Sequence, residues 1–387
     1  MASWSGSRWL TLPAILLIIE IGLRLAHPFL RPLRYALWSG DNIDLVQEID
    51  TSDDLIETLP PMYPANSWFM GMRLDPHGFW TPPYDRTRTE GTVRIVILGD
   101  SFAYSSGGVP YEQTWHTLTG RGLENAWHRP VETINLGLPG AGPLLEARAF
   151  DVAGADLKPD LVLLGLFVGN DLTDNSRSAG LLERASYLAR LVGNLGRNLD
   201  ALKVLWQAPG NGTYELSPRW DAEHYVYDPT RPTFPEDVFL RIEQQRAEIF
   251  LEDRRAWRDE RIAAVVEVID ALRRRVEAAG GQFVMVMIPD ELAVNDDLRR
   301  RVSGRIDADA GFVRALRIEE AHRELERELT ENGIPCLDLL PVMRAGARQQ
   351  SPYRPRDTHW NDYGNQLAAT AIVDWLVRLE PHGPSRS

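Results

Sequence analysis

The sequence predicts an α/β domain in which a parallel sheet of about five strands lies between two layers of helices. Short runs of β-branched and other apolar residues alternate along the chain with segments of helical periodicity. The runs are apolar on both faces, as expected for strands that helices cover from each side. Five runs have this character, at 92–98, 131–136, 160–168, 283–288 and 334–340.

The segments between these runs have the spacing of helices. In the longest of them, Ile262, Val266 and Ile269 recur at intervals of three and four residues. The predicted helices cover about 111–126, 142–156, 237–279, 311–331 and 361–379. Residues 175–236 break the alternation, and we interpret them as an insertion whose first half has helical spacing.

The N-terminal residues 1–26 predict a hydrophobic membrane anchor. The stretch 9–25 is mostly apolar, interrupted by Glu20 and Arg24. Its fully apolar run is shorter than the ~18–20 residues of a spanning helix, but charged side chains near the interface can snorkel to water. No small-residue cleavage site follows, which favours a retained anchor over a cleaved signal peptide. The alternative is an amphipathic or buried N-terminal helix.

The orientation of such an anchor is left open by the charges around it. Arg8 precedes the apolar stretch, whereas Arg24, Arg31 and Arg34 follow it. Counted literally, this distribution does not favour export of the body of the protein. We nevertheless expect a membrane-anchored protein whose main domain is periplasmic or otherwise extracytoplasmic.

The remaining chain divides by composition. Residues 27–90 are rich in Pro, Trp and Tyr and show little periodicity, which predicts an irregular connector packed on the domain that follows. Residues 91–380 then form the main domain, with the insertion at about 175–236.

Composition excludes several kinds of function. The formal net charge of −13 argues against a nucleic-acid partner, because phosphate binding needs a basic face. The chain has one cysteine, Cys336, so it forms no internal disulfide and no zinc site built from cysteines. The eight histidines lack metal-ligand spacing. We therefore expect neither a metal nor a cofactor.

Residues suited to acyl chemistry follow the first three predicted strands. Ser101 lies in Gly-Asp-Ser-Phe after the first, Gly137 lies after the second, and Asn170 lies in Gly-Asn-Asp after the third. Asp357 and His359 come just before the last predicted helix. Because ligands bind outside the carboxyl ends of strands in such sheets, these side chains are expected to meet there.

Each of these residue types has a task in acyl transfer. A serine hydroxyl attacks carbonyls well only when a base takes its proton, and histidine is that base near neutral pH. A carboxylate on the other ring nitrogen fixes the tautomer and stabilises the imidazolium. The oxyanion formed by attack needs N–H donors, which a serine backbone, a glycine backbone and an asparagine side chain supply.

The order of these blocks resembles the SGNH/GDSL hydrolase superfamily over about residues 92–379. The four hallmark residues of that superfamily match Ser101, Gly137, Asn170 and His359. The resemblance implies a flavodoxin-like three-layer α/β/α sandwich and metal-free hydrolysis of acyl esters. It implies Ser101 as nucleophile, His359 as base, Asp357 as its orienting carboxylate, and an oxyanion hole from the Ser101 N–H, the Gly137 N–H and Asn170.

The last block departs from the common pattern. Many superfamily members have Asp-x-x-His, whereas Asp357 and His359 are two residues apart. The Asp-Thr-His-Trp form is similar to that of bacterial SGNH-like proteins of exopolysaccharide O-acetylation. The spacing leaves open whether the two side chains touch, and it brings acetyl transfer into consideration.

Three functional hypotheses follow. The first is an esterase that removes acyl, plausibly acetyl, groups from a small molecule, a glycan or a lipid-linked saccharide. The second is an O-acetyltransferase of an exopolysaccharide that uses the same triad. The third is a non-catalytic SGNH-like scaffold.

Overall fold

The computed structural model describes residues 8–26, 68–76, 78–104, 106–174, 186–189, 191–193, 225–380 and 383–384. These residues fall into two compact units. The first unit holds helix α1 (Arg8–Ala26) and the short stretches 186–189 and 191–193, and the second holds the remaining described residues. Most of the predicted insertion, and residues 27–67 of the predicted connector, lie outside the described residues.

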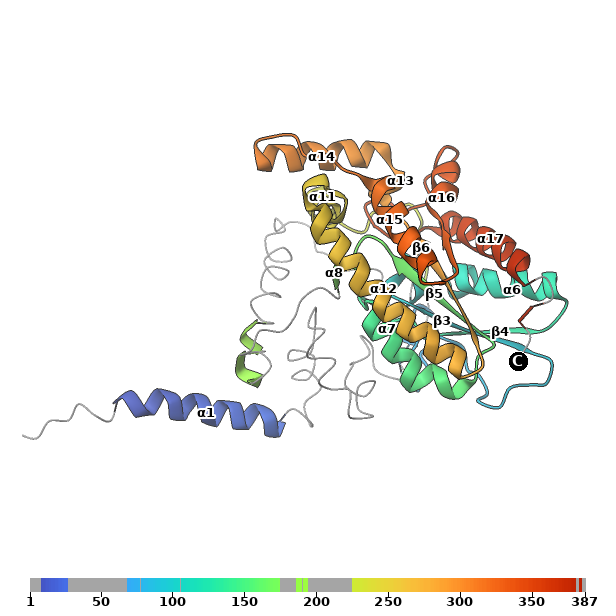
Figure 1. Ribbon diagram of the computed structural model, residues 1–387, viewed down its shortest axis with the longest axis horizontal. Helices are drawn as coiled ribbons and strands as arrows, with labels where there is room; N and C mark the ends of the chain where they lie inside the picture. The colour runs from blue at the N-terminus through green and yellow to red at the C-terminus, as the bar shows by residue number, and fades with distance from the viewer. Residues whose placement is uncertain are drawn as a thin grey trace, which may run out of the picture. The chain divides into compact units, whose positions relative to one another are not determined.

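The second unit is built on a five-stranded sheet in which every pair of neighbours is parallel. Its strands are β3 (Val93–Gly99), β4 (Val131–Asn135), β5 (Leu161–Phe167), β6 (Gln282–Ile288) and β7 (Cys336–Asp338). Their order across the sheet is β4-β3-β5-β6-β7, as Figure 1 shows. In chain order this is 2-1-3-4-5, the arrangement of flavodoxin-like folds. The predicted α/β architecture with about five parallel strands is confirmed.

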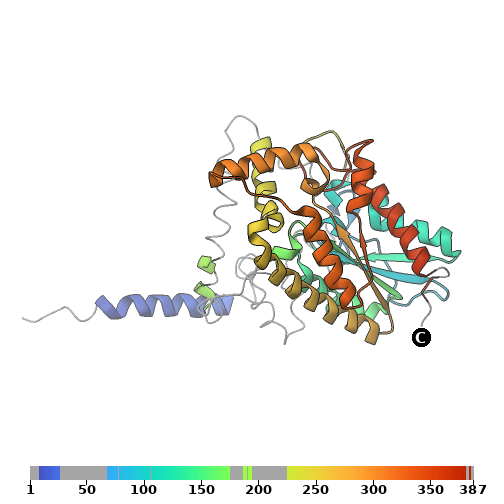
Figure 2. The ribbon, with the colours of Figure 1, turned by 45° about the horizontal axis from the view of Figure 1, so that its top comes forward.

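Helices cover the sheet on both sides. Helices α6 (Trp115–Trp127) and α17 (Asp362–Leu379) pack together on one face, as seen in Figures 1 and 2. The other face carries α7 (Pro143–Ala149), α12 (Arg255–Ala278) and α15 (Ile318–Glu331). Strands β3 and β5 are buried along their whole length because they lie between the two layers.

The prediction of one helix over 237–279 is wrong. The structure has α11 (Glu236–Arg246) and α12, separated by short 3-10 turns over 247–250 and 252–254. At the break, Leu251 is extended, with φ −70° and ψ 134°, and it forms an antiparallel bridge with Leu316. Leu251 is buried, so its side chain fits a helical pattern of apolar residues although its backbone is not helical.

Several helices begin or end where the sequence pattern did not indicate. Helix α15 begins at Ile318, not near residue 311. Helices α13 (Glu291–Val294), α14 (Asp296–Ala310) and α16 (Leu340–Ala347) were not predicted. Helix α14 is preceded by the N-cap Asn295, whose side chain accepts the N–H groups of Asp297 and Leu298.

Residues 68–90 contain an aromatic segment that packs on the sheet domain. Strands β1 (Trp68–Phe69) and β2 (Met72–Arg73) form a small antiparallel hairpin. The Phe69 ring lies 5.2 Å from the Tyr104 ring, and the Trp80 ring lies 5.0 Å from the Tyr111 ring. This part of the predicted connector therefore contributes to the hydrophobic core of the second unit.

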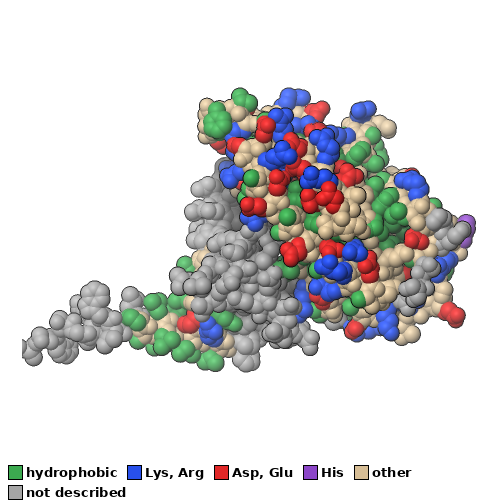
Figure 3. Space-filling model, in the orientation of Figure 1, with side chains coloured by type: hydrophobic (Ala, Val, Ile, Leu, Met, Phe, Trp, Pro, Cys, Tyr) green, Lys and Arg blue, Asp and Glu red, His purple; other side chains and the backbone are tan. Residues whose placement is uncertain are grey.

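The visible surface of the second unit mixes acidic and basic side chains. Figure 3 shows red and blue atoms interspersed over α12, α14 and α15. Ion pairs account for part of this pattern, including Arg255 with Glu320 at 3.1 Å and Arg314 with Asp253 at 2.8 Å.

Helix α1 of the first unit contains Pro13, Glu20 and Arg24 among its apolar residues. The Glu20 carboxylate accepts hydrogen bonds from the Ser186 hydroxyl at 2.8 Å and from the Leu188 N–H at 2.9 Å. Among the described residues no helix is both apolar and long enough to cross a bilayer, so the predicted transmembrane anchor is not supported.

Candidate active site

Ser101 is the first residue of α5 (Ser101–Tyr104), immediately beyond the carboxyl end of β3. Asp100 caps this short helix, because its Oδ1 accepts the N–H of Phe102 at 2.8 Å. Gly99 has φ 148°, and a Cβ there would lie 2.9 Å from the carbonyl oxygen of Gly165. A glycine is needed for the chain to turn this closely past β5.

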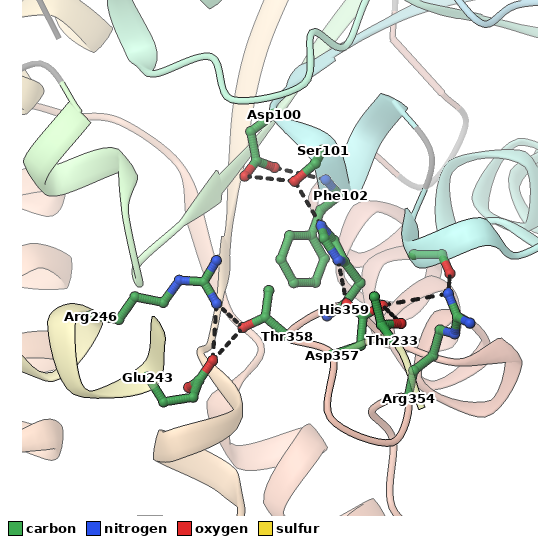
Figure 4. Close-up of polar contacts among 11 residues, drawn as sticks. Asp100, Ser101, Phe102, Thr233, Glu243, Arg246, Arg354, Asp357, Thr358 and His359 are labelled. Carbon is green, nitrogen blue, oxygen red and sulfur yellow. Dashed lines mark hydrogen bonds and ion pairs between the residues drawn. The ribbon is translucent and has the colours of Figure 1, made fainter. Parts of the chain in front are cut away.

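His359 comes from the loop before α17 and lies against Ser101. Its Nε2 is 2.8 Å from Ser101 Oγ, and its Nδ1 is 2.7 Å from Asp357 Oδ1 (Figure 4). Asp357 Oδ1 also accepts the backbone N–H of His359 at 3.1 Å. The structure thus brings together the three side chains singled out from the sequence. With two-residue spacing, the Asp357 carboxylate contacts the His359 ring directly.

Asp357 is buried and held by two further side chains. The Thr233 hydroxyl donates to its Oδ2, and the Arg354 guanidinium lies 3.5 Å from the same oxygen. Burial alone raises the pKa of Asp357. The charge and hydrogen bond of His359, with Arg354 and Thr233, outweigh this effect and lower the pKa to about 2. The carboxylate is therefore ionised at neutral pH.

Thr233 and Arg354 were not recognised from the sequence. Thr233 falls in the segment interpreted as the end of the insertion, yet its N–H donates to the Pro355 carbonyl at 3.2 Å. Arg354 also donates to the Gly107 carbonyl. Gly107 has φ 70°, and a Cβ there would lie 2.5 Å from the Cβ of His359.

An aromatic cluster supports the histidine. The Phe102 ring lies 5.0 Å from the His359 ring, 5.0 Å from the Trp360 ring and 4.7 Å from the Phe167 ring. Trp360 is fully buried and packs on Phe102. The imidazole therefore packs against a buried aromatic cluster next to the nucleophile.

Asp100 is a second carboxylate close to the serine hydroxyl. Its Oδ2 is 3.5 Å from Ser101 Oγ, farther than the 2.8 Å that separates Oγ from His359 Nε2. Burial raises the pKa of Asp100 to about 6, opposed by the Phe102 N–H and by the charges of His359 and Arg246. The shorter contact makes His359 the main partner of the hydroxyl.

The two other hallmark residues lie at the carboxyl ends of the strands beside β3. Gly137 follows β4, and a Cβ on it would lie 2.7 Å from the Ala103 Cβ in the serine helix. Its N–H donates to Asn135 Oδ1 at 3.0 Å. Asn170 lies in the turn after β5. Asp171 stabilises this turn, because its carboxylate accepts the Phe167 N–H at 2.7 Å.

Over the described ranges, no group of three or more His, Cys, Asp or Glu side chains is arranged to hold a metal ion.

Residues 246–385 match the family model described as the SGNH hydrolase-like domain of the acetyltransferase AlgX. This segment is similar to an SGNH hydrolase-like domain. The matched residues include Asp357 and His359, and the match begins well after Ser101. A search of curated proteins finds no match.

Several solved structures are similar to this chain at low sequence identity. The acetyl xylan esterase AlAXEase is 12% identical, with 73% of this chain and 100% of that chain covered and a TM-score of 0.39. The lipase/acylhydrolase from Enterococcus faecalis is 13% identical, with 76% and 100% covered and a TM-score of 0.40. A two-domain esterase active on acetylated mannans is 13% identical, with 76% and 52% covered and a TM-score of 0.39.

Proposed function

We propose that the protein is a serine esterase that cleaves acyl esters through an acyl-enzyme on Ser101. The observation that carries this proposal is the unbroken chain of contacts from Ser101 Oγ to His359 Nε2 at 2.8 Å and from His359 Nδ1 to Asp357 at 2.7 Å. A serine joined to an imidazole that is itself oriented by a carboxylate is the arrangement that activates a hydroxyl for attack on a carbonyl.

In the first half of the reaction, His359 Nε2 takes the hydroxyl proton as Ser101 Oγ bonds to the carbonyl carbon of the ester. The imidazolium then gives this proton to the oxygen of the departing alcohol, and the acyl group remains on Ser101. The ionised Asp357 stabilises the imidazolium, which is why its low pKa, about 2, supports the proposal.

The oxyanion of the tetrahedral intermediate takes hydrogen bonds from the backbone N–H of Ser101, the backbone N–H of Gly137 and the Asn170 side chain. Donors already in place lower the barrier because they need little reorganisation. The Gly137 N–H donates to Asn135 Oδ1 at 3.0 Å, and in the proposed reaction it keeps this direction and donates to the oxyanion as a second acceptor.

In the second half, His359 takes a proton from a water molecule, the hydroxide oxygen attacks the acyl carbon, and Ser101 leaves with the proton returned by His359. The products are a free acid and the regenerated enzyme. An acetyl group, carried on a saccharide hydroxyl, is the acyl group we propose, since the matched family model is described as an acetyltransferase domain.

Turnover of p-nitrophenyl acetate tests this proposal. We expect the purified protein to release p-nitrophenolate faster than Ser101→Ala and His359→Ala, by at least about a thousandfold if the three side chains act as one unit. Equal rates for the wild-type protein and Ser101→Ala would refute the esterase.

The second candidate is an O-acetyltransferase with the same acyl-enzyme. The match of residues 246–385 to the domain of an acetyltransferase favours it, because the matched segment holds both Asp357 and His359. In this reaction the hydroxyl of a saccharide, in place of water, attacks the acetyl-serine. Addition of an oligosaccharide to the p-nitrophenyl acetate reaction distinguishes the two, since only transfer produces acetylated oligosaccharide detectable by mass spectrometry.

A further inference from the structure

The middle residue of the Asp-Thr-His block points away from the serine. In Figure 4, His359 lies between Ser101 and Asp357, whereas Thr358 extends toward Glu243 and Arg246 of α11. Its hydroxyl is buried and has two partners there: Arg246 Nη1 donates to it, and it lies 3.1 Å from Glu243 Oε1. A guanidinium can only donate, so the hydroxyl proton of Thr358 goes to Glu243.

Glu243 and Arg246 are themselves fixed. Arg246 Nη1 lies 3.0 Å from Glu243 Oε1, and the Arg246 guanidinium carbon lies 5.4 Å from the centre of the Phe167 ring. Phe167 packs on Phe102, the ring that also supports His359. The Thr358 hydroxyl is therefore connected, through Arg246, to the same aromatic cluster that packs against the His359 ring.

Glu243 belongs to a buried group of carboxyls. Burial, together with the neighbouring Asp290, raises its pKa well above the ordinary value, against the charge of Arg246. Glu243 and Asp290 are hydrogen-bonded to each other, and within the described part of the chain Glu243 Oε2 and Asp290 Oδ2 have no other partner. A proton on Glu243 satisfies both oxygens, leaving Oε1 free to accept from Thr358 and Arg246.

Two pairs of side chains thus hold the Asp357-Thr358-His359 segment, one pair on each side of its backbone. Asp357 is held by Thr233 and Arg354, and Thr358 is held by Glu243 and Arg246. With only one residue between the carboxylate and the imidazole, a rotation of the backbone at Thr358 turns the His359 ring away from Ser101. Displacements of about 1 Å at a reacting group are known to cost on the order of a hundredfold in rate.

We propose that Thr358, held between Glu243 and Arg246, is a positioning residue that keeps the His359 ring in line with Ser101. This inference rests on the proposed function of the same site. Thr358 touches no reacting atom, and it acts through the backbone it shares with His359.

The rate of covalent labelling by a fluorophosphonate probe tests the inference. Mass spectrometry measures this rate at a series of pH values from 5 to 9. Thr358→Val removes the hydroxyl and keeps the shape. We expect it to be labelled about tenfold more slowly than the wild type, with a shifted apparent pKa of the labelling rate. The final extent of labelling stays at one probe per chain. Thr358→Ser restores the hydroxyl, and we expect its rate and apparent pKa to return close to those of the wild type.

Two further variants separate positioning from general loss of structure. Glu243→Gln carries an amide that donates to Asp290 and accepts from Thr358, so we expect it to be labelled much faster than Glu243→Leu. Thr370→Val makes the same chemical change on the exposed surface of α17, where the hydroxyl donates to the Gln366 carbonyl of the same helix, and is expected to behave as the wild type.

Each contrary outcome has a distinct meaning. If Thr358→Val is labelled at the wild-type rate with an unchanged apparent pKa, the positioning role is overturned while the proposed function stands. If its extent of labelling falls but the rate per labelled chain and the apparent pKa do not change, the hydroxyl serves folding only and the inference is again overturned. If the wild type is not labelled at Ser101, both the proposed function and the inference fall.

Discussion

At the scale of single residues, the site depends on a buried carboxylate that stays ionised. Asp357 loses hydration but gains His359, Arg354 and the Thr233 hydroxyl, and the balance lowers its pKa to about 2. The sequence pointed to Asp357 and His359 by type and order alone. It did not indicate Thr233 or Arg354, because their contacts depend on how distant loops fold over the block.

The lowered pKa of Asp357 makes a prediction about stability. A carboxyl with a folded pKa of about 2 and an unfolded pKa of about 3.9 contributes roughly 2 kcal/mol when ionised. This contribution is fully present above the unfolded pKa and is lost as pH falls through the folded pKa. Urea unfolding of the wild type and Asp357→Asn should show a stability difference that is about 1 kcal/mol smaller at pH 3 than at pH 6. A difference that grows toward pH 3 would contradict this account of the carboxylate.

Gly107 makes a prediction about geometry. It has φ 70°, and a Cβ on it would lie 2.5 Å from the Cβ of His359. We expect Gly107→Ala to lower esterase activity more than tenfold by displacing His359, and to destabilise the fold by about 1–2 kcal/mol. Gly304→Ala is the matched control, because that glycine lies within α14 with open space around it. Its expected effect is a gain of about 0.5–1 kcal/mol in stability with unchanged activity. Full activity in Gly107→Ala would show that the close approach is unimportant.

At the scale of elements, the break between α11 and α12 places the side chains that hold Thr358. It ends α11 at Arg246, which donates to Thr358. Periodicity did not reveal the break, since the buried residues around it continue a helical pattern of apolar positions. What bends the chain is a tertiary contact: the Glu252 N–H donates to the Ala315 carbonyl at 2.9 Å, and the Arg317 N–H donates to the Phe250 carbonyl at 2.6 Å. The strands, by contrast, were predictable because each is a short apolar run that ends in a turn.

Leu251 tests the importance of this break. It is 1% exposed, whereas Val313, in the loop that pairs with the break, is 82% exposed. We expect Leu251→Ala to lose about 2–4 kcal/mol of unfolding free energy through the cavity it leaves. Val313→Ala is expected to change stability by less than about 0.5 kcal/mol. Chemical denaturation measures both, and a small effect at Leu251 would mean that the break is not a packed feature.

At the scale of the whole molecule, the second unit extends further toward the N-terminus than composition indicated. A segment rich in Trp, Tyr and Pro looks irregular because its order comes from packing on another element and not from periodicity. Trp80 is fully buried, its carbonyl accepts from the Asn135 side chain at 3.1 Å, and Phe69 packs on Tyr104 behind the serine helix.

Truncation tests this extent. A chain that begins at Gly91 lacks Phe69 and Trp80, each of which is expected to contribute about 3–5 kcal/mol to stability. We expect it to show no cooperative thermal transition by circular dichroism, whereas a chain that begins at Trp68 should melt cooperatively. Cooperative melting of the shorter chain would contradict a structural role for residues 68–90.

The central claim is that Ser101 is an activated nucleophile, and covalent labelling by a fluorophosphonate addresses it most directly. The probe phosphonylates serine hydroxyls that a base has activated and leaves ordinary serines unmodified. We predict a single adduct on the peptide that contains Ser101, lost in Ser101→Ala and strongly reduced in His359→Ala. No adduct on the wild-type protein, or an adduct that persists in Ser101→Ala, would contradict the account.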